Sequence, residues 1–578
     1  MNFGVAAVLA VALGAGAPHA APAASHDASM NPAAMRALAH DYYASFYAEY
    51  PVSASDAGLH VGDSRLADYS AEARDARRQR VSLALQKISQ ADASSWSVDD
   101  QVDLALFRSD LNRAMFEDRV LRRASRDPGL YVEECSNAIF SLLKKEYAPR
   151  SVRARAATAR LAAMPALLAQ ARGNLTEAVQ LLARLAWQSI DGIGPLFNDS
   201  LGLLLAELGE EDRAALVTSR DSALAALRGF GEWLKASEGS FKAPLAMGRE
   251  NYNAMLRDIY LLPLDADQLV TLGRAELARA KAMEAWLPDP SLADTLRHPD
   301  AGPLPSNRAQ FLSDYEARTS TLMDYLARRE ILTVPNYIGP FRIVELPAAF
   351  RPTSPGGFMN APGVFDTDPA GFYFLPEFDP SSGNFYMRAA LGNPLPILGH
   401  EGIPGHFLQI SIANHLPGEI RRLHQDGVFV EGWALYGEEM LMRTGLYDDS
   451  PGGQAGRAQV LRLMRYRAAR VPVDVKLATG EWTFNRAVEY FMKEGGLDKE
   501  AATGEAAGAA VTPGQKMNYL VGKYQIERLL GLYRDRMGAE FRLRDFHDRL
   551  LSSGSIPLSL VEWLMLGDDA TYKSVRGK

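Results

Sequence analysis

The stretch His400-Glu401-Gly402-Ile403-Pro404-Gly405-His406 places two imidazoles and a carboxylate within seven residues. Zinc binds neutral imidazole nitrogens and carboxylate oxygens, and a catalytic zinc site keeps one of its four positions open. Two histidines with one further carboxylate ligand would meet this requirement. Because Glu401 directly follows the first histidine, we expect it to act as the general base that takes a proton from water. The stretch therefore predicts a zinc hydrolase site, which is found most often in peptidases.

The two histidines are six residues apart, and an undistorted helix cannot bring them together. Six residues turn a helix by about 600° and advance it by about 9 Å, so the two rings would point in different directions. Pro404 has no backbone N–H to donate, and Gly405 tolerates unusual dihedral angles. We therefore expect the helix to bulge or break here, so that His406 returns to the side of His400. The alternative is a helix that ends at Gly402, with both histidines in ordinary hydrogen bonds.

A second carboxylate, Glu431, lies 25 residues beyond His406 and opens an apolar run that is typical of a helix. This separation is long enough for a loop and an antiparallel return of the chain. We therefore predict that Glu431 lies against the two histidines as the third metal ligand. The alternative is a glutamate that only stabilises the start of its helix through the helix dipole.

Two segments carry a resemblance to a known family. Residues 400–409 read HEGIPGHFLQ, and residues 429–438 read FVEGWALYGE. The pair resembles the bacterial family called domain of unknown function 885, whose pattern is H-E-x-x-P-G-H followed by E-G-W-A-L-Y. That family is similar to the gluzincins, zinc peptidases with two histidines and a glutamate as ligands. The resemblance implies His400, His406 and Glu431 as zinc ligands and Glu401 as base, and it does not supply a substrate.

A later segment, residues 512–523, reads TPGQKMNYLVGK and resembles the family element P-G-Q-x-x-x-Y-x-x-G. On a helix, Gln515, Tyr519 and Gly522 share one face, and Gly522 would let that face approach another surface closely. A tyrosine hydroxyl aimed at the metal site can stabilise the oxyanion formed when water attacks a carbonyl. We therefore predict a catalytic role for Tyr519, and the alternative is a core tyrosine with a satisfied hydroxyl.

One segment departs from the family pattern. The family usually has a histidine shortly after an aspartate in a stretch like V-D-T-G-L-H-A-K-G-W, and here Ala478 stands at that place. This difference puts full activity or the usual substrate in doubt, although it leaves metal binding untouched. Arg470 and Asp474 are four residues apart, which favours an ion pair on one helix. The functional alternative is that Arg470 binds a substrate carboxylate.

Length and composition indicate a large folded protein rather than a disordered chain. The 578 residues are 47% hydrophobic, which is enough for a large core and ordinarily for more than one domain. The net charge of −8 argues against a nucleic-acid partner and against a strong basic patch for membranes. The single cysteine, Cys135, excludes an internal disulfide and a cysteine-rich metal site.

The N-terminal residues are typical of export. The run from Val5 to Ala15 has the length of a signal-peptide core, and Ala21-Pro22-Ala23 offers a cleavage site. We therefore expect a signal peptide over residues 1–23 and a periplasmic or secreted protein. A positive N-terminal region is missing, so a misassigned start and a cytoplasmic enzyme with an alanine-rich tail remain alternatives. No cysteine follows the run, so we expect no lipid anchor, and no later segment is long enough to span a membrane.

The remaining chain divides into three regions by its pattern. Residues 30–330 read as a helical N-terminal region, as in Arg153 to Gln170, Leu175 to Gln188 and Ala266 to Trp286. Residues 331–395 are rich in proline and glycine and favour short strands. Residues 396–578 return to helix and hold the zinc ligands.

The strongest strand candidate is Gly371 to Leu375, with Met359 to Ala361 in the same sheet. We expect it to be an edge strand that an extended substrate joins by β-pairing, which would make Tyr373 a substrate-binding residue. The alternative is a packed aromatic loop.

These observations predict a mainly α-helical protein with a large helical scaffold and a small β-sheet beside the zinc-site helices, as in gluzincins. We expect an exported zinc metallopeptidase that acts on peptides in a cleft between the two helical regions. A zinc hydrolase of a non-peptide amide or ester, or a catalytically impaired binding protein, are the alternatives.

Overall fold

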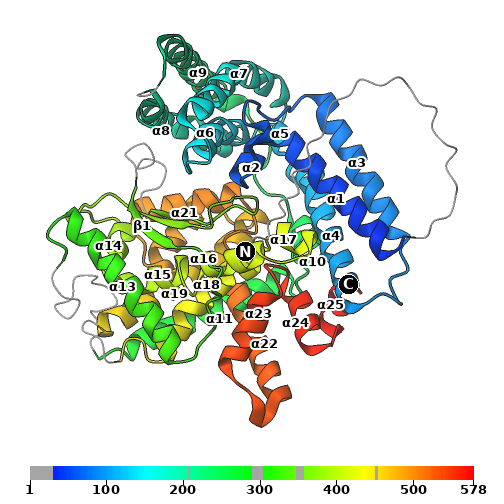
Figure 1. The fold of residues 1–578 in the computed structure, drawn as a ribbon, viewed down its shortest axis with the longest axis vertical. Coiled ribbons are helices and arrows are strands. Elements are labelled where there is room, and N and C mark those ends of the chain that lie inside the picture. Colours follow the sequence, from blue (N-terminus) through cyan, green and yellow to red (C-terminus); the bar gives the residue numbers. More distant parts are fainter. Residues whose placement is uncertain (1–29, 206–207, 289–303, 347–356, 449–452, 578) are drawn as a thin grey trace, which may run out of the picture.

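The computed structural model describes residues 30–577 except for four internal segments, 206–207, 289–303, 347–356 and 449–452. Most of the described residues lie in α-helices, and three short strands form one small sheet (Figure 1). This arrangement confirms the prediction of a mainly α fold with a small sheet. The predicted signal peptide, residues 1–23, lies outside the described residues. Among the helices described, none combines the length and apolar character needed to cross a membrane.

Several helices before the sheet begin after a residue whose side chain accepts from a free backbone N–H group. Asn31, Ser70, Ser97 and Asp265 each accept a hydrogen bond from the backbone N–H three residues later. The elements are α1 (Pro32–Glu49), α2 (Pro51–Asp56), η1 (His60–Gly62), α3 (Ala71–Ser89), α4 (Val98–Phe116), η2 (Glu117–Leu121), α5 (Arg123–Arg126), α6 (Gly129–Leu143), α7 (Arg150–Asn174), α8 (Gln180–Leu205), α9 (Glu210–Ser237), η3 (Glu238–Ser240), α10 (Arg249–Asp258), α11 (Ala266–Ala285) and α13 (Arg308–Arg328).

The helix that was predicted from Leu175 to Gln188 begins later than expected. Helix α7 ends at Asn174 and α8 begins at Gln180, so the residues between them are not helical. The backbone N–H groups of Glu177 and Val179 donate instead to the carbonyls of Ser125 and Arg126. Hydrogen bonds to the short helix α5 therefore replace the first helical turn that composition alone favours.

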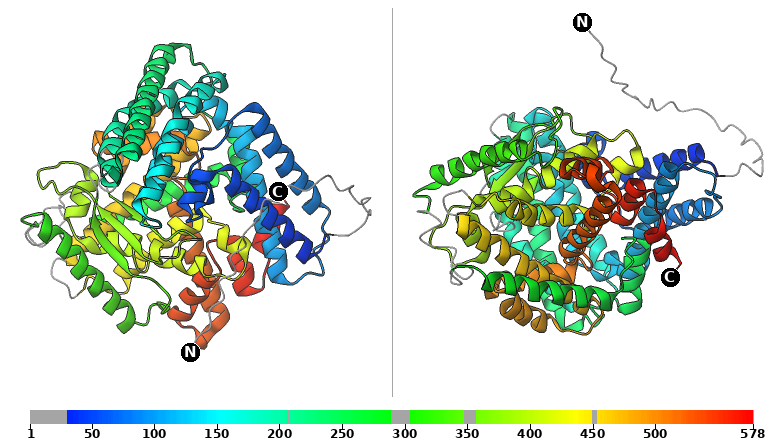
Figure 2. Two further views of the ribbon diagram at one scale, coloured as in Figure 1. Left: turned by 45° about the horizontal axis from the view of Figure 1, so that its top comes forward. Right: turned by 90° about the horizontal axis from the view of Figure 1, so that it is seen from below.

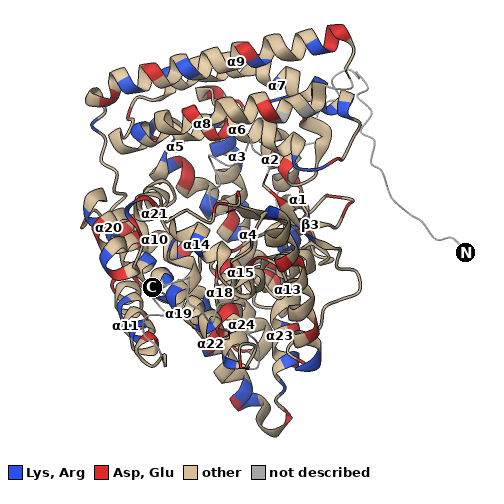
Figure 3. Ribbon diagram, turned by 90° about the vertical axis from the view of Figure 1, so that its left-hand side faces the viewer, with Lys and Arg blue, Asp and Glu red and all other residues tan. Residues whose placement is uncertain are grey.

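Two large hydrophobic clusters organise these helices. The first contains buried residues of α1, α3, α4, α10, α11 and α13 together with most C-terminal helices. The second is built from α6, α7, α8 and α9, which form a separate layer over the rest of the molecule (Figure 3; another direction in Figure 2). Residues 30–330 therefore contribute to both clusters.

The sheet has the order β1-β3-β2, so its last strand in sequence lies in the middle. Strand β1 (Phe341–Glu345) pairs in parallel with β3 (Gly371–Leu375), and β2 (Phe358–Asn360) pairs antiparallel with β3. The predicted strand positions are confirmed, including the shared sheet. The prediction that residues 371–375 form an edge strand is wrong, because β1 and β2 already occupy both sides of β3. A substrate cannot join β3 by β-pairing.

The helices after the sheet carry the candidate site. They are α14 (Phe385–Leu391), α15 (Pro394–Glu401), α16 (His406–Asn414), α17 (Glu419–Leu423), α18 (Gly427–Arg443), α19 (Gly453–Ala478), α20 (Phe484–Tyr490), η6 (Phe491–Gly495), α21 (Lys499–Val511), α22 (Asn518–Met537), η7 (Gly538–Glu540), α23 (Leu543–Ser552), α24 (Leu558–Leu566) and α25 (Ala570–Arg576). Helix α18 packs closely on α22, and α19 packs on α11 from the N-terminal region.

Candidate metal centre

The chain breaks its helix between the two histidines of the motif. Helix α15 ends at Glu401 and α16 begins at His406, which confirms the predicted distortion. A Cβ atom on Gly405 would lie 1.9 Å from the carbonyl oxygen of His400, so only glycine fits this close return. The indole N–H of Trp433 on α18 donates to the carbonyl of Pro404 at 2.7 Å. The break is thereby fixed to the helix that carries Glu431.

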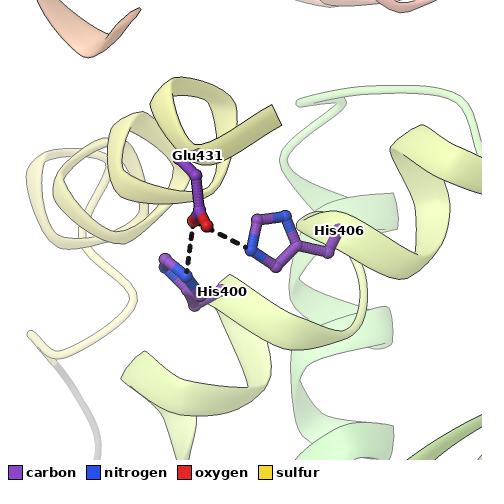
Figure 4. A group of neighbouring side chains, drawn as sticks. All are labelled: His400, His406 and Glu431. Carbon is purple, nitrogen blue, oxygen red and sulfur yellow. Dashed lines mark ion pairs between the residues drawn. The ribbon is translucent and has the colours of Figure 1, made fainter. Parts of the chain in front are cut away.

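His400, His406 and Glu431 converge at this break (Figure 4). Oε2 of Glu431 lies 3.7 Å from Nε2 of His400 and 3.3 Å from Nε2 of His406. The two imidazoles are buried, and the Glu431 side chain keeps 17% of its surface exposed. Burial alone would raise the pKa of Glu431, but the two histidines hold it well below its usual value. The carboxylate is therefore ionised and available to a cation.

The donor atoms fit a single divalent metal ion. One atom from each of the three residues lies within 4.8 Å of the other two. Oε2 of Glu431 is buried and has no hydrogen-bond partner, although it lies between two imidazole nitrogens. Such an orphaned acceptor is costly unless a cation satisfies it. Two nitrogens and one carboxylate oxygen suit zinc, and other first-row divalent ions also accept this set.

A second carboxylate orients the first histidine. Nδ1 of His400 is 2.7 Å from Oε1 of Glu438, which is fully buried and also pairs with Arg467 at 3.0 Å. A proton on Nδ1 leaves Nε2 free as a metal ligand. Burial and Arg467 lower the pKa of His400, yet the carboxylates of Glu431 and Glu438 raise it to about 9. A metal ion bound at this site would therefore compete with a proton.

Sequence reasoning did not single out Glu438 or Arg467. Glu438 lies seven residues beyond Glu431 on α18, and this spacing places both carboxylates on one helical face. This seven-residue spacing could therefore have identified Glu438 as a candidate site residue from the sequence. Arg467 carries no such signal, because its contact with Glu438 depends on how α19 packs against α18.

Tyr519 reaches the site because α22 approaches α18 at two glycines. A Cβ atom on Gly522 would lie 1.8 Å from the Val428 carbonyl oxygen, and one on Gly432 would lie 2.4 Å from Cα of Gly522. The predicted close approach at Gly522 is confirmed. The Tyr519 ring lies nearly parallel to that of His400, with 6.1 Å between centroids. Burial and the charge of Glu431 raise the pKa of Tyr519, so its hydroxyl stays a proton donor.

Arg470 has a different ion-pair partner from the one predicted. Its Nε and Nη2 atoms lie 2.8 and 2.7 Å from the two carboxylate oxygens of Glu505 on α21. The guanidinium also lies over the Tyr519 ring, 4.3 Å from its centroid. Asp474 does not pair with Arg470; it accepts the backbone N–H groups of Gly514 and Met517 at 2.7 and 3.0 Å. The predicted helical pair is wrong because Asp474 instead fixes the turn before α22.

The charge of Glu401 is felt by Tyr373 of the sheet. Glu401 is half-buried at the end of α15, and the Tyr373 ring on β3 is only 3% exposed and stacks on Tyr315. Burial, Tyr315 and the charge of Glu401 all raise the pKa of Tyr373, so its hydroxyl is protonated near this carboxylate. Glu401 thus acts on Tyr373 through its charge, while the role of Glu401 as base and the contact of Tyr373 with a substrate stay predictions.

Ala478 lies at the far end of α19. It is eleven residues beyond Arg467, which corresponds to about 16 Å along the helix axis. Its carbonyl accepts the backbone N–H groups of Met247 and Gly248 at 2.9 and 3.1 Å. Arg467, rather than residue 478, is therefore the part of α19 that contacts the His400–Glu438 pair.

Fold and site together define a mainly helical protein with a candidate divalent-metal centre made of two histidines and a glutamate. The chain belongs to the family described as bacterial protein of unknown function (DUF885), whose model matches residues 51–565. This match confirms the predicted family. Among curated proteins, none matches the chain.

Two solved structures share the fold. One is described as a "putative lipoprotein of unknown function" from Shewanella oneidensis; it is 22% identical, with a TM-score of 0.73, covering 93% of this chain and 100% of its own. The other is described as a "putative lipoprotein" from Colwellia psychrerythraea; it is 18% identical, with a TM-score of 0.78, covering 95% of this chain and 100% of its own. At these identities the likeness concerns the fold.

Proposed function

We propose that this protein is an exported zinc metallopeptidase of the gluzincin-like type. The observation that supports it best is the convergence of His400, His406 and Glu431 around an unsatisfied carboxylate oxygen, with Glu401 next to the first ligand. Zinc, when bound to these three residues, supplies a Lewis acid that activates water and polarises a carbonyl. The other groups at the site belong to the chain and have assignable roles.

Glu401 is the proposed general base. It takes the proton that water loses on attacking the scissile carbonyl and then delivers this proton to the leaving amine. Tyr373 lies in the electrostatic field of this carboxylate. Direct binding of substrate by Tyr373 remains part of the proposal, and it requires the nearly buried ring to become accessible.

Tyr519 is the proposed oxyanion donor. Its hydroxyl keeps its proton at neutral pH because burial and Glu431 raise its pKa, and it can donate to the negative oxygen as the carbonyl becomes tetrahedral. Arg470 lies over the Tyr519 ring and is held by Glu505. We assign Arg470 chiefly to positioning Tyr519, and a contact with a substrate carboxylate would compete with Glu505.

Export is supported by the apolar N-terminal run and by the description of both solved relatives as lipoproteins. In a bacterial host, the proposal predicts a mature chain that begins near residue 24 and is recovered outside the cytoplasm. Intact-mass measurement of the fractionated protein tests this point.

The peptidase proposal is tested by metal content and by turnover of a peptide library. The parent should bind one zinc ion and cleave peptides, and His406→Ala should lose the metal. Glu401→Gln should keep the metal while turnover falls by about 10² to 10⁴-fold. Glu419→Gln, which changes a half-buried carboxylate paired with His40, serves as the control. Zinc-loaded protein that cleaves no peptide, or Glu401→Gln that cleaves as fast as the parent, would contradict the proposal.

A further inference from the structure

A cavity of about 480 Å³ lies in the N-terminal part of the molecule, away from the metal centre. Residues of α1, α3, α4, η2, α5 and α6 line it, and none of the metal-site residues does. In Figure 1, α1, α3 and α4 lie on the right, and α5 and α6 lie toward the top. The wall includes Tyr42 and Val81 from the first hydrophobic cluster and Tyr69 and Leu130 from the second. Ligand cavities are often found at such junctions and have this size.

Aromatic side chains form the apolar part of the wall. Tyr42, Phe46, Tyr50 and Tyr69 all line the cavity, and the rings of Phe46 and Tyr50 lie 5.0 Å apart. The guanidinium of Arg77 lies over the Tyr50 ring at 4.7 Å. The cavity therefore offers an apolar middle with charged groups around it.

Most of the charged groups in the wall already have partners. The pairs are Arg78 with Asp118, Arg80 with Glu49, Arg122 with Glu177, and Arg123 with Asp127 and Glu133. These pairs leave little net attraction for a simple ion. The charged side chains outside these pairs therefore decide what the cavity can bind.

Two guanidinium N–H donors in the wall lack an acceptor. Nε of Arg74 and Nε of Arg77 are buried and have no hydrogen-bond partner. Arg74 has no ion pair among the described residues. Arg77 has only a long ion pair, 3.6 Å from its Nε to Oε2 of Glu49, and Glu49 also pairs with Arg80. Buried guanidinium donors without acceptors are costly, and a planar carboxylate is the ligand group that suits them best.

One carboxylate in the wall also lacks a partner. The Glu117 side chain forms no hydrogen bond or ion pair with any residue that the structure describes, and it is accessible through the cavity. Desolvation raises the pKa of the Glu117 carboxyl, although the charges of Arg113 and Arg123 lower it at longer range. Glu117 begins the short π-helix η2, and Arg122, which follows it, has a left-handed φ of 48°. Such irregular turns cost backbone energy and are frequent at functional sites.

We propose that this cavity is a second binding site, for a small zwitterion with a carboxylate, an apolar middle and an ammonium group, such as an amino acid or a dipeptide. The carboxylate pairs with Arg74 and Arg77, the ammonium group pairs with Glu117, and the aromatic wall covers the part between them. The site is independent of the metal centre and does not require the proposed peptidase activity.

Calorimetric titration of the full chain carrying His400→Ala and His406→Ala tests this, because that protein cannot bind a ligand through zinc. The probe is the dipeptide leucyl-phenylalanine, beside its N-acetyl and C-amide derivatives. We expect the free dipeptide to bind at least tenfold more tightly than either derivative. Since this comparison is made within one protein, it remains decisive even if a cavity variant folds poorly.

Cavity variants then assign each charge. Arg74→Met should weaken binding of the free dipeptide at least tenfold and leave binding of the C-amide unchanged. Glu117→Gln should also weaken binding of the free dipeptide at least tenfold, and it should leave binding of the N-acetyl derivative unchanged. Arg119→Met changes an exposed arginine of η2 that does not line the cavity, and it should bind like the parent. Absence of dipeptide binding at millimolar concentration, or equal binding of all three probes, would overturn the proposal. A cleavage result at the metal centre has no bearing on it.

Discussion

At the residue scale, the candidate metal ligands could be predicted because the residue types and their order in the sequence indicate this chemistry. Two histidines and a glutamate are a recognisable ligand set. The helix break at Pro404 and Gly405 explains how two histidines six residues apart can face the same point. Arg470 was harder, since a spacing of four residues favours Asp474 but the folded chain supplies Glu505 from another helix. Long-range partners of buried charges depend on packing, which a local pattern does not contain.

The contact between Glu438 and His400 predicts an effect on metal affinity. Glu438→Gln removes the charged acceptor that holds the proton on Nδ1 of His400, so zinc affinity should fall by about 10 to 100-fold. Competition with a fluorescent chelator measures this change. Glu489→Gln alters an exposed glutamate that pairs with Arg486 and should leave the affinity at the parental value. Parental affinity in Glu438→Gln would show that this carboxylate does not support the ligand.

Burial of Asp474 predicts a pH-dependent term in stability. Its pKa is raised from 3.8 to about 6 in the folded protein, chiefly by burial and despite the N–H groups of Gly514 and Met517. The folded state therefore binds the proton more tightly, and stability is lost as pH rises through this window. Between pH 4 and 7 the loss amounts to about 2 kcal/mol.

Asp474→Asn removes this titration. The free energy of unfolding of the variant relative to the parent should therefore rise by about 2 kcal/mol from pH 4 to pH 7, whatever its offset at a single pH. Urea denaturation of both metal-free proteins at several pH values gives this difference. A difference that stays constant with pH would show that Asp474 does not titrate in the folded protein.

At the element scale, helix positions were predictable from composition and period, and strand positions from aromatic runs bounded by proline. The strand order was not predictable, because β3 lies between β1 and β2 and only the folded chain shows which neighbours a strand has. The edge-strand prediction failed for this reason. The approach of α22 to α18 was foreseeable at Gly522, since a glycine on a helical face permits close packing.

Crossing of α18 and α22 at Gly432 and Gly522 predicts a steric effect. Gly522→Ala puts a Cβ atom against the Val428 carbonyl, so it should lower stability by about 1 to 3 kcal/mol and move Tyr519 away from Glu431. Urea denaturation and peptide turnover are the measurements. On the same helix, Gly531 is exposed and has no neighbour within 4 Å, so Gly531→Ala should be neutral or stabilising. Equal effects of the two variants would argue against a tight crossing.

At the scale of the whole molecule, the sequence indicated more than one structural unit but not how the helices are shared. Helices α10, α11 and α13 precede the sheet in sequence, yet they share a hydrophobic cluster with the helices that carry the candidate metal ligands. Helices α6 to α9 form the other cluster. Amphipathic helices show which face is buried but not which neighbour covers it, so this grouping emerges only from the fold.

This grouping predicts how metal binding stabilises the molecule. All three ligands lie on helices of the first cluster, so zinc at 1,000 times its dissociation constant should add about 4 kcal/mol to the stability of that cluster. Hydrogen exchange with and without a chelator should show lost protection in α15, α16, α18 and α22 and no change in α7, α8 and α9. In His406→Ala, the chelator should have no effect on any of these helices. If protection in α7 to α9 fell as much as in α18, the two clusters would unfold as one unit, and metal binding would stabilise the whole chain.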